Sequence, residues 1–136
     1  MIPRPMCLPI TTSTSRRSTL RIAVDTSAYY SMMAPGDTHH AAATSVARGL
    51  HADGYELWTV SYVAGEVAAL VQARLGLGPL RRLRAAFDRE TTIVWMDAEL
   101  HAAAWDELER IGRRQVSLVD CALAVAALRE GITDVF

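Results

Sequence analysis

Residues 21–28 have the sequence RIAVDTSA, and this stretch decides the fold class. Ile22, Ala23 and Val24 form a short apolar run, which is typical of a strand buried on both faces of a parallel sheet. We expect a strand over residues 21–25 and a short helix over residues 26–33. A strand that passes directly into a helix favours the α/β class.

The rest of the chain repeats this alternation. Further short strands are expected over residues 57–60, 91–96 and 132–136, and helices over residues 37–49, 61–75, 80–89, 97–111 and 117–130. Four of these helices are expected to begin at side chains that commonly cap helices, namely Asp37, Ser61, Asp97 and Ser117. The alternation of strands and helices predicts a parallel sheet covered by helices.

Composition limits the classes of protein that the chain can belong to. With 136 residues, about half of them apolar, it is long enough for one domain with a real core. No apolar run reaches the roughly 18 residues of a membrane-spanning helix. The net charge is −1 and all 14 basic residues are arginines, so only local arginine clusters could hold a nucleic acid. Cys7 and Cys121 match no metal-binding spacing, and we expect Cys121 to be a packed thiol, consistent with a reducing cytoplasm.

Residues 1–20 differ from the remainder. They contain three prolines and a Ser/Thr-rich stretch without apolar periodicity, which predicts a disordered N-terminal tail. We therefore expect one folded domain over residues 21–136, with the natural start near Leu20.

Three acidic residues stand in apolar surroundings, unlike the other acids of the chain. Asp25 follows a buried strand, Glu66 lies in YVAGEVAAL, and Asp120 lies in LVDCALAVAAL. Burying an ionised carboxylate costs several kcal/mol unless a positive group meets it, and three converging carboxylates would repel one another. A divalent cation would resolve both problems, and a site with only oxygen ligands suits Mg²⁺ or Mn²⁺ better than Zn²⁺.

Each acid also has an ordinary structural explanation. Asp25 could cap the helix that begins at Thr26, and Asp120 could form a capping box with Ser117. Glu66 lies in mid-helix, where an ion pair with an arginine such as Arg48 or Arg74 is the alternative.

Taken in order, these residues resemble a PIN domain, and in particular the VapC-type toxin ribonucleases. The family's first strand ends in Asp-Thr-Ser, as in VDTSA at residues 24–28. Four further segments resemble motifs of the family, namely PGDTHH at 35–40, TVSYVAGE at 59–66, SLVDC at 117–121 and GITDVF at 131–136. The resemblance covers residues 21–136.

The resemblance implies a three-layer α/β/α domain with a short parallel sheet of about four strands. It implies a cytoplasmic endoribonuclease toxin that hydrolyses RNA with Mg²⁺ or Mn²⁺ held by Asp25, Glu66 and Asp120. The implied partners are the RNA substrate, a second protomer in a homodimer, and a VapB-type antitoxin that inserts a peptide over the acidic pocket. The helix expected over residues 26–33 is rich in large apolar side chains and could form an interface with the antitoxin or the second protomer; these side chains are Tyr29, Tyr30, Met32 and Met33.

Other polar residues could assist such a site. Thr26, Ser27 and Ser117 are hydroxyls that could orient the carboxylates or touch a phosphate, with ordinary helix capping as the alternative. A cluster of arginines just before Ser117 could hold RNA phosphates, with a solvated helix end as the alternative: Arg110, Arg113 and Arg114.

One departure from the family pattern suggests a second hypothesis. Such proteins usually carry a fourth acid two or three residues beyond the Val-Phe strand, but this sequence stops at Phe136, and Asp134 precedes the strand's end. We expect either a truncated C-terminal end or a three-acid site. The alternative function is a catalytically inactive PIN-like module that only binds a partner. A receiver-like fold that phosphorylates a strand-end aspartate is disfavoured because it needs a lysine, and the chain has none.

Overall fold

A computed structural model describes residues 20–136, and its centre is a parallel sheet of three strands in the order β1-β2-β3. The strands are β1 (Arg21–Ala23), β2 (Glu56–Val60) and β3 (Thr91–Val94). Ala23 pairs with Trp58 and Val60 with Val94, so neighbouring strands end at nearly the same level. The α/β prediction is confirmed.

The expected fourth strand is reduced to one bridge beside β1. Val135 pairs in parallel with Ala23, and the amide of Ala23 donates to the carbonyl of Asp134 at 2.9 Å. The amide of Asp25 donates to the carbonyl of Phe136 at 2.9 Å. This segment therefore runs along the free edge of β1 towards the end of the sheet where Asp25 lies.

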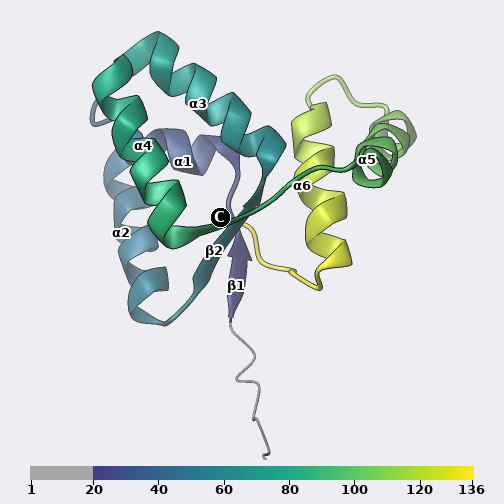
Figure 1. The fold of residues 1–136 in the computed structure, drawn as a ribbon, viewed down its shortest axis with the longest axis horizontal. Helices are drawn as coiled ribbons and strands as arrows, with labels where there is room; N and C mark the ends of the chain where they lie inside the picture. Colours follow the sequence, from purple (N-terminus) through teal and green to yellow (C-terminus); the bar gives the residue numbers. More distant parts are fainter. Residues whose placement is uncertain (1–19) are drawn as a thin grey trace, which may run out of the picture.

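Within residues 20–136, six helices cover the sheet on two sides (Figure 1). Their bounds are α1 (Thr26–Met33), α2 (His40–Ala52), α3 (Ser61–Leu75), α4 (Leu77–Glu90), α5 (Ala98–Ile111) and α6 (Leu118–Arg129). Figure 1 shows α1 to α4 on one side of the strands and the pair α5 and α6 on the other. This is the expected three-layer arrangement.

The core lies where both helical layers meet the sheet. Trp58, Val60 and Val24 are fully buried, and α3 adds Val63 and Val67 one helical turn apart. At the centre of the sheet the hydroxyl of Thr59 donates to the carbonyl of Val24 at 2.8 Å, which satisfies a buried polar group. Cys121 is a free, buried thiol, as expected, and its burial raises the pKa of the thiol.

Three helix starts differ from the predictions, each for its own reason. Asp37 does not cap α2 but accepts hydrogen bonds in the preceding turn from the hydroxyl of Ser31 and the amide of His39. Ser61 is the first residue of α3, not its cap, and its hydroxyl accepts from the amide of Met96 at 3.0 Å. The last difference is in α4, which begins at Leu77, three residues earlier than expected, since proline is tolerated in a first helical turn.

The predicted N-terminal tail, residues 1–20, lies outside the described residues apart from Leu20. None of the helices between residues 20 and 136 combines the length and apolar character needed to span a bilayer.

Candidate functional site

The chain topology brings the starts of three helices to one end of the sheet. Because α1 and α3 directly follow parallel strands, both begin at the carboxyl end of the sheet, where ligands bind in open α/β folds. The segment after α6 enters the sheet at the opposite end, so α6 also begins at the carboxyl end (Figure 1). We call this end, with Asp25, Glu66 and Asp120, the acidic edge.

Asp25 is the N-cap of α1, which is the structural role that the sequence analysis gave as the alternative to metal binding. Its Oδ1 accepts hydrogen bonds from the amide of Ala28 at 2.8 Å and from the hydroxyl of Ser27 at 2.9 Å. These bonds fix the carboxylate at the point where the chain leaves β1.

Glu66 is held near Asp25 by a hydrogen bond from Thr26, the residue that follows Asp25 and begins α1. The hydroxyl of Thr26 donates to Oε2 of Glu66 at 2.5 Å, across 40 residues of sequence. No ion pair between Glu66 and Arg48 or Arg74 exists between residues 20 and 136; Arg74 instead lies over the ring of Tyr30, 5.4 Å from its centroid. Thr26 therefore links the two predicted site helices.

Asp120 forms the capping box that the sequence suggested as its alternative role. Its Oδ2 accepts from the amide of Ser117 at 2.8 Å, and the hydroxyl of Ser117 accepts from the amide of Asp120 at 3.1 Å. The box orients the carboxylate at the first turn of α6.

The prediction that all three acids are buried is wrong. Asp25 is half-buried, while Glu66 and Asp120 are exposed. In α3 the buried face is formed by Val63, Val67 and Val71, and Glu66 lies beside that face. In α6 the fully buried residues begin at Cys121, one position after Asp120. Water can therefore solvate these carboxylates, and the cost of desolvation does not by itself demand a cation.

The donor chemistry nevertheless fits a hard divalent cation. Within the described residues each of the three carboxylates has one oxygen in a hydrogen bond and a second oxygen without one, and none pairs with an arginine. The helix starts of α1 and α6 hold two of them in fixed orientations. However, no group of three or more His, Cys, Asp or Glu side chains in residues 20–136 is arranged to hold a metal ion.

The three arginines predicted to hold RNA differ in whether they form an ion pair. Arg110 makes two hydrogen bonds to the carboxylate of Glu107, at 2.8 and 2.6 Å. This pairing lowers the pKa of Glu107 and raises that of Arg110. Arg113 and Arg114 are exposed, lie between α5 and α6, and have no ion pair in the described part of the chain.

The structure also contains an exposed aromatic cluster that the sequence analysis did not identify. The indole N–H of Trp105 donates to Nε2 of His101 at 3.1 Å, and Nδ1 of His101 is hydrogen-bonded to the hydroxyl of Tyr62. The i, i+4 spacing of His101 and Trp105 was visible in the sequence, but the contact with Tyr62 was not. We call these three residues the aromatic triad.

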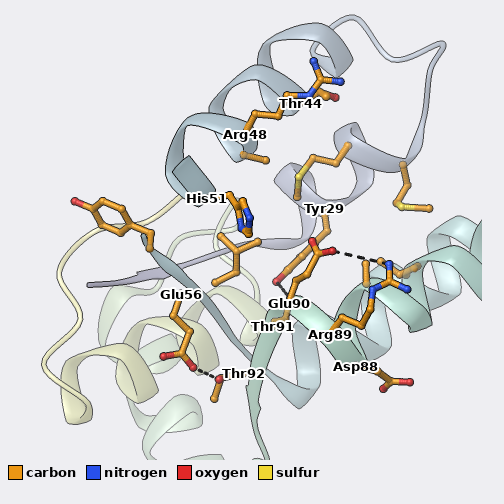
Figure 2. A pocket seen from close by; sticks show the side chains of 17 residues that line it. Tyr29, Thr44, Arg48, His51, Glu56, Asp88, Arg89, Glu90, Thr91 and Thr92 are labelled. Atoms are coloured by element: carbon orange, nitrogen blue, oxygen red, sulfur yellow. Dashed lines mark hydrogen bonds and ion pairs between the residues drawn. The ribbon is translucent and has the colours of Figure 1, made fainter. Parts of the chain in front are cut away.

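A groove of about 810 Å³ lies away from the acidic edge, between α1, α2 and α4 (Figure 2). Its floor includes the first residues of β2 and β3, so it opens towards the amino ends of these strands. The hydroxyl of Tyr29 is hydrogen-bonded to Thr91 at 3.1 Å there, and burial raises the pKa of Tyr29 to about 12. The Thr44 hydroxyl, also in its lining, is buried without a hydrogen-bond partner among residues 20–136.

Comparisons with known proteins give a family match. Residues 22–135 match the model of the PIN domain. Among solved structures, the chain is similar to Mycobacterium tuberculosis VapC20, described as a sarcin–ricin loop cleaving toxin, with 26% identity and a TM-score of 0.73, covering 84% of this chain and 86% of that one.

A second similar structure is VapBC2 from Rickettsia felis bound to a DNA fragment from their promoter. The identity is 18% and the TM-score 0.64, with 86% of this chain and 87% of that one covered, so this likeness supports the fold alone. The comparison with curated proteins gave no match.

Proposed function

This chain belongs to the PIN domain family, and we propose that it is a VapC-type toxin, an endoribonuclease that depends on Mg²⁺ or Mn²⁺. The observation that carries the proposal is the acidic edge, where Asp25, Glu66 and Asp120 each keep one carboxylate oxygen without a hydrogen bond in the described residues. The similarity to VapC20, whose description names an RNA-cleaving toxin, supports RNA as the substrate.

In the proposed mechanism Asp25, Glu66 and Asp120 hold the cation. When bound, it supplies a water of lowered pKa and neutralises charge on the phosphate. Thr26, Ser27 and Ser117 act as positioning residues, because each hydrogen-bonds a carboxylate or shares its capping box.

The substrate would be held by groups beside the carboxylates. The free amides at the start of α6 favour an anion such as a phosphate. Arg113 and Arg114 are available for further phosphate contacts because neither is engaged in an ion pair within residues 20–136. Arg110 contributes less, because Glu107 already neutralises it.

We assign the groove between α1, α2 and α4 to the antitoxin. Its lining combines apolar side chains such as Met32, Met33 and Leu83 with polar ones such as Arg48 and Glu90, as expected for a surface that a second chain covers. A homodimer in the cytoplasm is part of the same proposal. A peptide leaving the groove would have to pass round the sheet to reach the acidic edge.

A second candidate function is a catalytically inactive module that binds only its partner. It is favoured by the absence, among the described residues, of any three acids already arranged around a common centre. Such a module would use the groove and have no need of a cation.

Asp25→Asn tests the proposal because asparagine retains helix capping while removing the charge. We expect Mn²⁺-dependent cleavage of a structured RNA by the natural chain, abolished by chelator, and a rate reduced on the order of 100-fold or more in the variant. Saturating Mn²⁺ should raise the melting temperature of the natural chain and not that of Asp25→Asn.

Asp97→Asn is the matched control. Asp97 caps α5 with the same kind of bond, its carboxylate accepting from the amide of Leu100 at 2.8 Å. This variant should cleave RNA and respond to Mn²⁺ like the natural chain. Cleavage that survives chelator, or equal losses in the two variants, would refute the metal role of Asp25 and leave the partner-binding function.

A further inference from the structure

The aromatic triad is exposed although its polar atoms are already paired. Trp105 keeps 45% of its surface accessible, and Tyr62 is half-buried. Because Nε2 of His101 accepts from the indole, the proton of the neutral imidazole lies on Nδ1 and is donated to the hydroxyl of Tyr62. The accessible surface of Trp105 is therefore mainly apolar ring, with its only donor group occupied.

The triad is also held in a defined geometry. The rings of Tyr62 and His101 meet edge to face with centroids 6.0 Å apart, and those of His101 and Trp105 do so at 6.3 Å. The three rings come from two elements, α3 and α5, that lie in different layers of the fold. A bound planar group would thus find an oriented ring, with little conformational entropy left to lose.

The triad is continuous with the acidic edge. Tyr62 lies four residues before Glu66, so the two side chains are neighbours along the surface of α3. Tyr62 also follows Ser61, whose hydroxyl joins α3 to Met96 at the carboxyl end of β3. A group stacked on the triad would therefore lie beside the carboxylates proposed to hold the cation.

We propose that the aromatic triad stacks an unpaired nucleobase of the RNA next to the scissile phosphate, an inference that rests on the proposed nuclease function. Stacking on an aromatic ring does not depend on a basic surface, which suits a chain of net charge −1.

The test measures binding of a short single-stranded RNA and of the same RNA with one abasic position, by fluorescence anisotropy in chelator so that cleavage is absent. The natural chain should bind the intact RNA on the order of ten-fold more tightly than the abasic one. Trp105→Ala should lose this preference, and Trp105→Phe, which keeps a ring, should retain most of it. Leu128→Ala, at a 74% exposed residue near the far end of α6, is the control and should behave like the natural chain.

The outcomes separate this inference from the nuclease proposal. A preference for the intact RNA that disappears in Trp105→Ala supports stacking even if no variant cleaves RNA, a result that would count against the nuclease proposal alone. Equal affinities of the natural chain for the two RNAs would overturn the inference. So would light scattering that finds a dimer for the natural chain and a monomer for Trp105→Ala and Trp105→Phe, because the triad would then be a protein interface.

Discussion

At the scale of single residues, Asp25 and Asp120 combine a structural and a proposed chemical role. Each carboxylate uses one oxygen to cap its helix and leaves the other without a hydrogen bond among the described residues. Capping therefore does not compete with metal binding; it fixes the direction in which the second oxygen points. The two explanations that the sequence offered for each residue are compatible.

The variant Asp120→Asn tests whether, in the absence of metal, repulsion between the carboxylates or helix capping by Asp120 has the larger effect on stability. If the three carboxylates repelled one another strongly, removing one charge would raise the melting temperature. Since the acids are accessible to water and Asp120 belongs to a capping box, we expect a decrease of about 0.3–1 kcal/mol in stability, seen by thermal unfolding in chelator. Asp106→Asn, an exposed site within α5, should cause no change. A higher melting temperature for Asp120→Asn would indicate that repulsion outweighs capping.

At the scale of elements, a few polar side chains fix how the helices meet. Thr26 joins α1 to α3 through Glu66, and Ser61 joins the start of α3 to the segment before α5. In the turn between α1 and α2, Asp37 accepts from Ser31 and from the amide of His39. These bonds connect segments whose helical periodicity alone leaves their mutual arrangement open.

The turn between α1 and α2 should make stability depend on pH. The backbone amide of His39 and the hydroxyl of Ser31 lower the pKa of Asp37. A carboxyl whose pKa is lower in the folded state stabilises the fold above its unfolded pKa, and this contribution is lost as the pH falls through the folded value. Asp37→Ala should therefore be less stable than the natural chain at pH 7, by urea unfolding. The difference should shrink at acidic pH; a difference independent of pH would contradict this account.

At the scale of the whole molecule, the two regions proposed to be functional lie at different ends of the sheet. The acidic edge gathers at the carboxyl ends of the strands, whereas the groove of Figure 2 involves the first residues of β2 and β3. We therefore expect the proposed RNA cleavage and the proposed antitoxin binding to be separable by substitution.

Ala47→Glu tests that separation, because Ala47 lines the groove on α2. A buried charge without a partner is costly, so we expect a large loss of antitoxin affinity, measured by calorimetry, with RNA cleavage unchanged. Ala42→Glu, on an exposed position of the same helix outside the groove, should bind the antitoxin normally. Normal antitoxin binding by Ala47→Glu would place the antitoxin elsewhere.

The sequence by itself determined the order of strands and helices and the caps at Asp97 and Ser117, because periodicity and capping depend on residues close together in the chain. For Asp25 it left capping and a metal role as alternatives, and the assignment of the three acids to a metal site stays a prediction. The tertiary structure alone decided that the acids remain accessible to water, that Thr26 meets Glu66, and that the aromatic triad and the groove exist. Those features need contacts between segments tens of residues apart, and such contacts depend on how whole layers pack rather than on local pattern.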